Sequence, residues 1–524
     1  MPILKRLVAT VPAVWTAWVI ARILLGLIIL NDYSPRGDVA YYFYGEFGDD
    51  PTMMTEYPHA GTWPVEVLTF LIGDRIDAFY IAFVLMCMLF DALFLAFVLR
   101  GHQNNSRVYY AGWLWVFFGT LTGQVFYMRL DIFPALAVAA AAACIVRWPN
   151  IAAALLAFAT TMKLWPGVLA AGLVGRLTKG KMWLRLLSFF GALVALCAVT
   201  VFTRGWDRLI SPLTYQENRG LQIESIPATP FIYQAFFEPE RWEMGYASSK
   251  SFEISGPGVD QAITWSTYAM IATIAFALLW ALWRFFVGTW HPRSTIAFFA
   301  VMVLLLIATN KVFSPQYIMW FGPLLAVAIR QPKIAGTPKT RVVIRVLLVL
   351  LALLTLVCAG LGSFVYPANY NFIWQDVGVE YAPVAALALR NILIVVMAVL
   401  ALIWLALETW CDWKMSKHDP SAETSPASAP LATTPGADAT DAVPASVASP
   451  STATPSTATP STPDTDTAST SQASTSEASA RDTSENPGPA SGSKASPQAI
   501  SAESPENSPR QIAADQHSAG RHYE

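Results

Sequence analysis

The chain has 524 residues, of which 54% are hydrophobic and only 13% are charged, roughly half the charged fraction of an ordinary soluble domain. Its formal net charge of -2 at pH 7 leaves no basic surplus of the kind that binds nucleic acid. The five cysteines lie in or beside apolar segments without a Cys-x-x-Cys spacing, so we expect buried thiols, with neither a disulfide framework nor a zinc site.

The first apolar segment is too long for the core of a signal peptide, and no small-residue cleavage site follows it. We therefore predict a retained membrane helix there. In chain order, about twelve segments are long and apolar enough to be predicted spans: 11–30, 78–99, 108–127, 132–147, 150–162, 164–177, 184–203, 263–284, 295–309, 316–330, 342–364 and 384–410. The shortness of the fifth and sixth segments leaves the helix count around 150–177 open.

Lysine and arginine are concentrated in alternate connections between these segments, as expected for cytoplasmic loops. The basic connections include "RGHQNNSR", "GRLTKGKMWLR" and "RQPKIAGTPKTRVVIR", which share a side with "LKR" near the start and "CDWKMSK" after the last span. The pattern predicts an all-α integral membrane protein of the plasma membrane with both termini cytoplasmic. The longest connections, 31–77 and 204–262, are then external.

Residues 416–524 differ in composition from the preceding 1–415, being rich in Ser, Thr, Ala and Pro with a small "STATP" repeat. Such a segment cannot bury enough apolar surface to offset the entropy lost on folding. We predict a membrane domain over 1–415 and a disordered cytoplasmic tail over 416–524. A passive tail is the simpler interpretation, and phosphorylation or partner tethering is the alternative.

The first long external loop contains "GDVAYYFYGEF". If this stretch is helical, Asp38, Tyr41 and Tyr42 share one face, which would set a carboxylate beside two phenols as a candidate base with hydrogen-bond partners. The alternative is an interfacial helix in which Asp38 is a cap and the tyrosines belong to an aromatic belt.

The same loop continues with "TEYPHAGTWP", where two prolines interrupt helix formation around Glu56 and His59. A histidine facing a cavity could bind a phosphate or carry a proton, whereas a solvated loop histidine is the ordinary case. We expect the following "WPVEVLTFLIG" to form a short helix at the membrane interface.

Ionisable residues also stand at the predicted outer ends of several spans. Since charges bordering a span are costly, they normally face a polar interior, although each cation by itself could snorkel to the interface. The ionisable residues are Arg129, Asp131, Lys163 and Lys311, and the amide side chain of Gln316 lies beside them in the sequence. Together they favour a cationic pocket for a phosphate. Asp91 differs because it lies deep in a span, where we expect it to pair with another span.

The second long external loop contains "YQENRGLQIESIPATP". Its Gln216, Glu217, Arg219, Gln222 and Glu224 form a compact polar stretch suited to binding hydroxyl-rich ligands, because loops on a rigid scaffold commonly carry binding residues. Their spacing alone does not identify a sugar.

Five stretches of this chain, "GDVAYYFYGEF", "RLDIFPA", "MKLWPG", "QENRGLQIESIPATP" and "NKVFSPQYIMW", resemble recurring blocks of glycosyltransferase family 87. The likeness covers about residues 10–410, and "RGLQIES" and "NKVFSPQY" are its most specific parts. The resemblance implies a GT-C-like helical bundle and an α-mannosyltransferase of the actinobacterial type, which uses a polyprenyl-phosphate-linked sugar as donor. A lipoglycan or glycolipid would be the acceptor.

In the mechanism that the resemblance implies, Asp38 occupies the position of the catalytic base, and the neighbouring Asp32, Asp49 and Asp50 remain alternatives. Asp38 would take the proton of the acceptor hydroxyl, with inversion at the anomeric carbon. The candidates for holding the phosphate are Arg219, Lys163 and Lys311, and those for positioning the sugars are Glu56, His59, Glu224 and Gln316. We expect no cofactor and no metal, although the Asp49–Asp50 pair is the alternative for a divalent ion.

Two alternatives stay open at this point. An arabinofuranosyltransferase with a polyprenyl-phosphate-arabinose donor fits the same resemblance. A lipid or sugar transporter would use a mid-membrane group such as Asp91, yet the polar residues lie at one face and no repeat between halves is visible. The sequence does not define the linkage, the acceptor or the oligomeric state.

Overall fold

The structure is a computed structural model that describes residues 9–32, 36–103, 105–178, 180–217, 219–247, 249–331, 336–374 and 378–418. The chain divides into two units, Met1–Thr434 and Pro435–Glu524, and the described residues all belong to the first. Almost all of the predicted disordered tail lies outside the described residues, so its disorder stays a prediction.

Within the described ranges the protein is mostly helical, and seven helices are long and apolar enough to cross a membrane. They are α2 (Val11–Asn31), α5 (Ile76–Leu99), α9 (Gly180–Arg204), α12 (Val259–Phe286), α13 (Pro292–Thr309), α15 (Pro338–Ser363) and α16 (Tyr381–His418). This confirms the prediction of a helical membrane-embedded protein.

The other predicted spans coincide with shorter helical elements. These are α6 (Arg107–Thr122) with η1 (Gly123–Phe126), α7 (Ile132–Cys144), α8 (Pro149–Met162), η2 (Trp165–Leu173), and η4 (Pro315–Trp320) with α14 (Gly322–Arg330). The 16 residues of α6 span about 24 Å at 1.5 Å per residue, less than a hydrocarbon core of ~30 Å. The number of twelve spans is therefore not confirmed.

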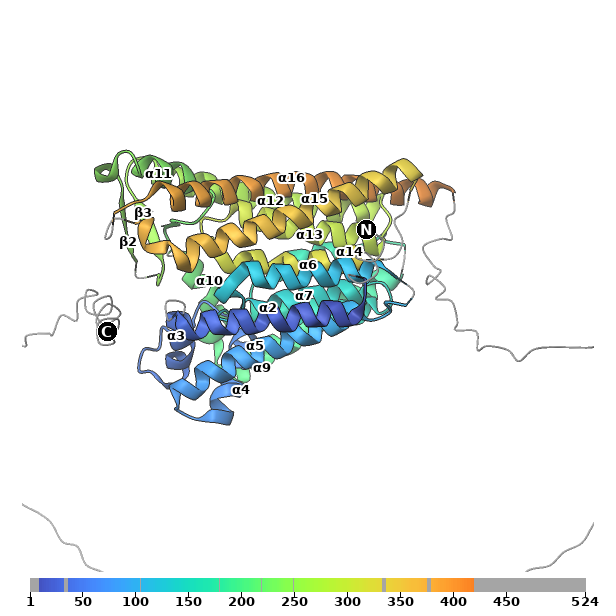
Figure 1. Cartoon of the computed structure of the whole chain (residues 1–524). Coiled ribbons are helices and arrows are strands. Elements are labelled where there is room, and N and C mark those ends of the chain that lie inside the picture. Colours follow the sequence, from blue (N-terminus) through green and yellow to red (C-terminus); the bar gives the residue numbers. More distant parts are fainter. Residues whose placement is uncertain are drawn as a thin grey trace, which may run out of the picture. The chain divides into compact units, whose positions relative to one another are not determined.

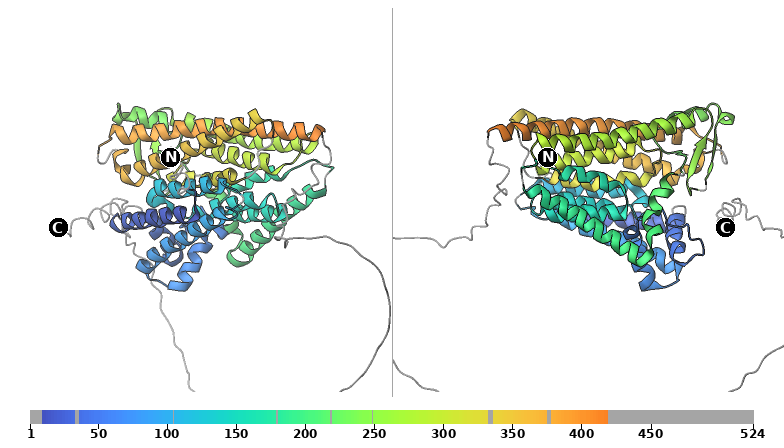
Figure 2. Two further views of the ribbon diagram at one scale, coloured as in Figure 1. Left: turned by 45° about the vertical axis from the view of Figure 1, so that its right-hand side comes forward. Right: turned by 180° about the vertical axis from the view of Figure 1, so that it is seen from behind.

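The membrane helices run between two distinct ends of the bundle (Figure 1). We call the end where α2 finishes at Asn31 and α5 begins at Ile76 the site end. In Figure 1 this end lies at the left, where α3, α11, β2 and β3 gather, and Figure 2 shows the same gathering from behind. The other end, where α5 finishes at Leu99 and α6 begins at Arg107, is called the opposite end.

The connections at the site end fold into helices and one small sheet. They comprise α3 (Arg36–Phe47), α4 (His59–Ile72), α10 (Trp206–Glu217), β1 (Leu221–Gln222), α11 (Thr229–Ala235), η3 (Pro239–Arg241), β2 (Glu243–Tyr246), β3 (Phe252–Ser255), η5 (Phe364–Ala368) and η6 (Tyr370–Phe372). The strands run antiparallel in the order β1-β3-β2, with Met244 and Leu221 both paired to Ile254. The sequence did not predict this sheet, because strands of two to four residues are too short to show an alternating pattern.

Residues 219–258, excluding 248, and 364–374 form what we call the cap, which has a small apolar core of its own. Ile223, Ile232 and Ile254 are buried in this core together with Val365 from beyond α15. The second half of the chain thus contributes to the same layer as the 204–262 connection. That layer holds side chains from distant segments next to the ends of the membrane helices.

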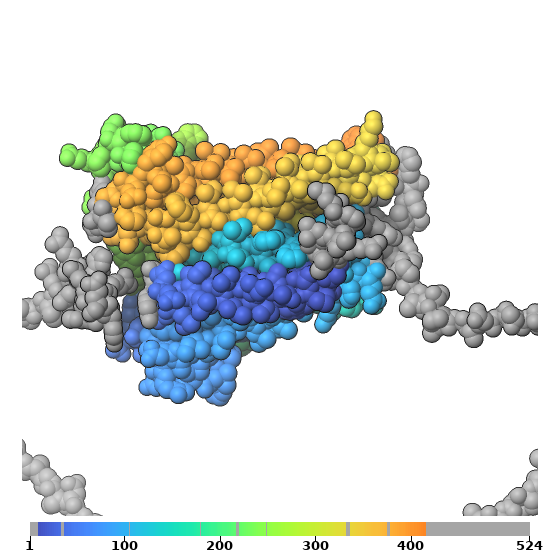
Figure 3. Space-filling model, viewed as in Figure 1, coloured from blue at the N-terminus to red at the C-terminus, as the bar shows by residue number. Residues whose placement is uncertain are grey.

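Helix α4 contains the predicted "WPVEVLTFLIG" helix but begins earlier, at His59, so Pro64 lies inside the helix and, contrary to the prediction, does not interrupt it. The helix presents apolar side chains outward. Phe70 is 87% exposed, and Val67 and Leu71 are also exposed. The light-blue segment that includes this helix projects below the neighbouring helices in Figure 3. Gly61 lies against the backbone carbonyl of Met162, so any side chain at this position would separate α4 from the end of α8. An exposed apolar face of this kind suits a membrane interface.

Charge is distributed unequally between the two ends. Of the acids in the described ranges, only Glu408 and Asp412 lie at the opposite end, and both are buried. Asp91 lies within α5, and the remaining acids are at the site end. Basic residues at the opposite end include Arg100, Arg107, Arg147, Arg176, Lys181, Arg330, Lys339, Arg341 and Lys414. This separation is what the basic connections of the sequence predicted.

Asp91 pairs inside the bundle, as predicted. Its carboxylate accepts from Arg22 of α2 at 2.7 Å, from Trp18 at 2.9 Å and from Trp115 of α6 at 2.7 Å, and Tyr127 donates to it as well. Both Arg22 and Asp91 are almost fully buried. Four donors saturate the carboxylate, which gives Asp91 a structural role in joining three helices.

Candidate active site

Asp38 lies at the site end in the first turn of α3, next to two side chains from distant parts of the chain. It forms an ion pair with Arg129, which follows η1 and is only 5% exposed, whereas the Asp38 side chain is 39% exposed. Arg129 also donates through Nη2 to the hydroxyl of Tyr366 at 3.0 Å, and that hydroxyl lies 3.5 Å from Oδ2 of Asp38. The carboxylate is thus held by a fixed cation while remaining accessible.

Burial raises the pKa of Asp38 above its ordinary value of 3.8, and the nearby negative charge of Asp131 acts in the same direction. The Arg129 guanidinium and the Tyr366 hydroxyl oppose the rise. A carboxylate with a raised pKa accepts a proton more readily than a fully solvated one. Asp38 therefore has the accessibility and the basicity that a general base requires.

Asp131, at the start of α7, holds Lys163 from the end of α8. The Lys163 ammonium lies 2.6 Å from Oδ1 of Asp131, which also accepts from the indole of Trp320 at 2.6 Å. The rings of Tyr57, Tyr317 and Trp320 surround the ammonium at 5.2–5.4 Å from their centroids. The second oxygen of Asp131 is buried and has no hydrogen-bond partner among the described residues. Lys163 is consequently a fixed positive charge in an aromatic cage.

Two side-chain contacts hold Glu56 and the tyrosines of the first loop in place, one between Tyr41 and Glu56 and one between Tyr42 and Tyr57. The Tyr41 hydroxyl donates to Glu56 at 2.9 Å and accepts from the backbone N–H of Met54 at 2.7 Å. The hydroxyls of Tyr42 and Tyr57 lie 3.3 Å apart. Burial raises the pKa of Glu56, and the positive charges of Lys163 and Arg219 lower it. The stretch is helical, as α3, but its phenols have other partners than Asp38: Tyr41 is bonded to Glu56 and Tyr42 lies beside Tyr57, whereas the phenol next to Asp38 is that of Tyr366.

The stretch around Arg219 joins the same region from the cap. Arg219 lies over the ring of Tyr215, and the Nε of Arg219 is buried without a hydrogen-bond partner among the described residues. Gln222 donates from its side chain to Ser314 at 3.0 Å and from its backbone to the carbonyl of Lys311 at 3.1 Å. These contacts bring the "QENRGLQIES" and "NKVFSPQY" stretches together.

Lys311 is half-buried, and desolvation lowers the pKa of its ammonium. The Glu253 carboxylate opposes that decrease, while the charge of Arg219 adds to it. Gln316, in η4, has a buried side-chain oxygen without a hydrogen-bond partner among the described residues. Lys311 and Arg219 are therefore near enough to repel one another, as cations that share an anionic ligand would be.

Two predicted site residues are occupied elsewhere. Glu224 is buried and bonded to Arg390 of α16 at 2.7 Å, while its backbone carbonyl accepts from both Arg390 and Asn391. His59 is 3.5 Å from Glu66, which in turn pairs with Arg204 at 3.2 Å, and desolvation lowers the pKa of His59. Glu224 thus fastens the cap to α16, and His59 belongs to the contact between α4 and α9.

The alternative acids of the first loop differ from Asp38 in their surroundings. Asp32 accepts from Gln124 at 2.6 Å. Asp49 is exposed, and Asp50 caps its own turn by accepting from Thr52. In the described part of the chain, no three His, Cys, Asp or Glu side chains converge as a metal site would require. The expectation that no metal takes part stays a prediction.

Three residues of this region were not among the predicted site residues: Tyr366, Trp320 and Arg390. Tyr366 follows α15 and lies 237 positions from Arg129, so no local pattern links the two. Trp320 ends the "NKVFSPQYIMW" stretch, but its partner Asp131 lies 189 positions away, so no local pattern links the two. Arg390 lies within a predicted span, and a charge inside a span is a signal that could have found it.

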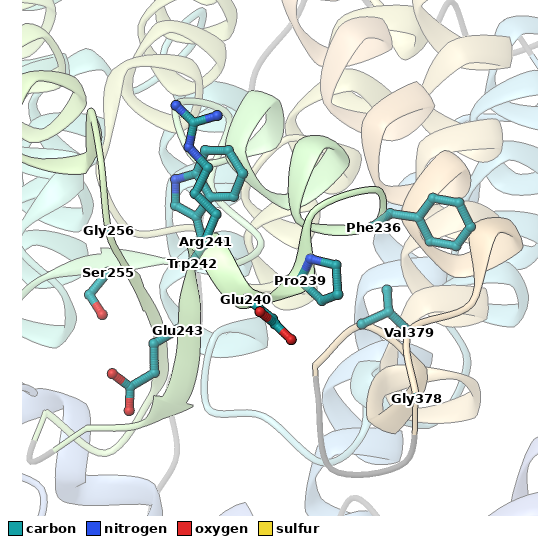
Figure 4. A pocket seen from close by; sticks show the side chains of 10 residues that line it. All are labelled: Phe236, Pro239, Glu240, Arg241, Trp242, Glu243, Ser255, Gly256, Gly378 and Val379. Atoms are coloured by element: carbon teal, nitrogen blue, oxygen red, sulfur yellow. The ribbon is translucent and has the colours of Figure 1, made fainter.

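A cavity of about 760 Å³, which we call the cap cavity, opens between the cap and residues 378–379 (Figure 4). Its lining residues are Phe236, Pro239, Glu240, Arg241, Trp242, Glu243, Ser255, Gly256, Gly378 and Val379. A smaller cavity of about 320 Å³ lies along α4.

Comparisons of this chain with models of protein families, with curated proteins and with solved structures found no match.

Proposed function

We propose that this protein is an inverting membrane glycosyltransferase of the family 87 type. It transfers a hexose, with mannose as the first candidate, from a polyprenyl-phosphate donor to a lipoglycan or glycolipid acceptor. The observation that carries this proposal is Asp38, an accessible carboxylate of raised pKa fixed by Arg129 at one end of a membrane bundle. The sequence blocks that resemble the family contribute Asp38, Arg129, Lys163, Arg219 and Lys311 to this same end.

In the proposed reaction, Asp38 removes the proton of an acceptor hydroxyl while the hydroxyl oxygen forms a bond to the anomeric carbon. The bond from that carbon to the phosphate oxygen breaks on the opposite face, and polyprenyl phosphate leaves with the bonding pair. The configuration inverts, so a β-linked donor gives an α-linked product. One base suffices because the donor already carries a good leaving group.

The leaving phosphate requires positive charge that the protein has not already neutralised. Arg129 is paired with Asp38, and Lys163 with Asp131, so these two cations mainly orient the acids. Arg219 and Lys311 belong to no ion pair recorded among the described residues, and they lie close enough for the charge of Arg219 to lower the pKa of Lys311 in addition to the larger effect of desolvation. We assign the departing phosphate to Arg219 and Lys311.

The orientation follows from the charge distribution. The opposite end carries the basic connections and corresponds to the cytoplasmic side. The site end, with most of the acids, then faces the extracytoplasmic side of the plasma membrane. A lipid-linked donor can reach Asp38 there, because the long helices that end nearby expose apolar side chains to the bilayer.

The proposal is tested by reconstituting the full chain in vesicles with a labelled polyprenyl-phosphate donor and a membrane extract as acceptor. Separate reactions contain the mannose and the arabinofuranose donor, and vesicles without the protein are the control. We expect label in lipoglycan from the mannose donor, in α linkage. If only the arabinofuranose donor supports transfer, the donor sugar is arabinofuranose and not mannose. If neither donor supports transfer, the proposed function is wrong.

A further inference from the structure

The cap cavity has a divided lining of polar and apolar groups. Glu240, Glu243 and Ser255 contribute oxygen atoms, while Phe236, Pro239 and Val379 contribute hydrocarbon. The two carboxylates are not neutralised by their neighbour Arg241. Figure 4 shows its guanidinium directed away from them, and it pairs with Glu238 at 2.9 Å over the Trp242 ring.

One wall of the cavity depends on a glycine. Gly256 has a φ of +134°, and a Cβ there would lie 2.7 Å from Cδ1 of Trp242 and 2.9 Å from the carbonyl oxygen of Arg241. Trp242 is itself fixed, because its indole donates to the carbonyl of Pro257 at 3.1 Å. The β2–β3 pairing, with Glu243 opposite Ser255, completes this wall. The cavity is therefore preformed by backbone geometry.

Strand β2 connects the cavity to the active site. Glu243 at its start lines the cavity. Tyr246 at its end is exposed; desolvation of its hydroxyl by the neighbouring chain raises the pKa, and the nearby charges of Asp38 and Glu56 raise it further. Three residues of strand cover about 10 Å. The first loop also touches the β2–β3 turn, since Lys250 lies 3.4 Å from Asp50. A chain molecule lying along β2 would reach both places.

We propose that the cap cavity binds a neutral glycan segment of the acceptor and thereby delivers the acceptor's terminal hydroxyl along β2 to Asp38. This inference rests on the proposed function and adds the substrate subsite that it lacks. Carboxylate and hydroxyl oxygens accept hydrogen bonds from sugar hydroxyls, and the apolar side chains pack against the C–H faces of the rings. Glu240 and Glu243 form no recorded ion pair within the described ranges, so their negative charge disfavours the donor's phosphate in this cavity.

Direct binding to the full chain in detergent tests the inference. The probes are fluorescently labelled α-mannotetraose and α-arabinotetraose, with labelled tetragalacturonate as an anionic comparison. The test variants are the double substitution Glu240→Gln with Glu243→Gln, which keeps the shape of the cavity, and Ser255→Trp, which fills it. Asp260→Asn is the matched control, because it removes one exposed acid at the start of α12 outside the cavity.

We expect a neutral tetrasaccharide to bind, tetragalacturonate to bind at least tenfold more weakly, and both cavity variants to weaken binding at least tenfold. Asp260→Asn should bind as the unmodified chain does. The inference is overturned if neither neutral probe binds or if the Glu240/Glu243 double variant binds normally. If the neutral probes bind as expected but no donor supports sugar transfer, the transferase proposal alone is overturned. If sugar is transferred but the cavity variants bind the probes normally, the subsite alone is overturned.

Discussion

The ammonium of Lys163 and the carboxylate of Asp131 lie 2.6 Å apart, joining the end of α8 to the start of α7 within the aromatic cage. Asp131 is completely buried and Lys163 is 19% exposed, so each requires the other for charge compensation. The pair also lies beside the Arg129–Asp38 pair, whose carboxylate senses the charge of Asp131. Two coupled ion pairs thus anchor the centre of the site end.

Asp131→Asn should destabilise the protein because it leaves Lys163 without its partner. Breaking a buried ion pair costs about 3–5 kcal/mol, and the partial exposure of Lys163 places the expected loss at about 2–3 kcal/mol. Unfolding titrations in SDS measure the difference. The double variant Asp131→Asn with Lys163→Met should recover part of the loss, and an unchanged midpoint for Asp131→Asn would disprove the coupling.

Transfer activity should fall at acid pH as Asp38 becomes protonated. Because burial raises the pKa of Asp38, the acid limb of the rate profile should lie above the ordinary value of 3.8. Arg129 opposes this rise, so Arg129→Gln should move the limb to still higher pH. The measurement is kcat/KM against pH for both proteins, and a limb that stays in place in Arg129→Gln would exclude the assigned pairing.

Tyr366→Phe should lower kcat about five- to tenfold, because the hydroxyl that bridges Arg129 and Asp38 is worth ~1 kcal/mol. Tyr366 is a positioning residue in this account. Its hydroxyl lowers the pKa of Asp38, so the acid limb of the pH profile should also move to higher pH in Tyr366→Phe. Tyr370→Phe is the matched control, since its ring packs 5.1 Å from that of Tyr366. Equal effects of the two substitutions would assign the loss to packing.

Glu224→Gln should affect stability more than substrate affinity. Its carboxylate is bonded to Arg390, and both side chains are almost completely buried. We expect the SDS midpoint to decrease while KM for the donor changes less than twofold. A KM increase without loss of stability would instead restore Glu224 to substrate binding, as the sequence had predicted.

The membrane helices could be predicted because apolar length and the placement of basic residues are local properties of the sequence. Every predicted span coincides with helical elements, from α2 to α16. The number of full crossings could not be predicted, since elements such as η2 are helical and apolar yet short. The small sheet was missed because its strands carry too few residues to show a period of two.

The candidate site could be predicted by residue type more than by pairing. Arg129 and Lys163 could be predicted because charges beside a span normally face polar surroundings, and Asp38 because of its helical spacing to two tyrosines and the family resemblance. The structure brings all three to one end. Which acid pairs with which base depends on packing of distant segments. The Asp38–Arg129–Tyr366 contact needs the first loop, the turn after η1 and the end of α15 together, and no local pattern encodes this.

The central claim is that the Asp38 carboxylate activates the acceptor hydroxyl, and a single substitution tests it most directly. Asp38→Asn keeps the shape of the side chain and removes its basicity, whereas Asp49→Asn makes the same change at an exposed acid of the same loop. The measurement is the initial rate of sugar transfer from a labelled polyprenyl-phosphate donor in vesicles with equal amounts of inserted protein. We predict that Asp38→Asn loses at least 99% of the rate and Asp49→Asn stays within twofold of the unmodified chain. Full transfer by Asp38→Asn would contradict the account.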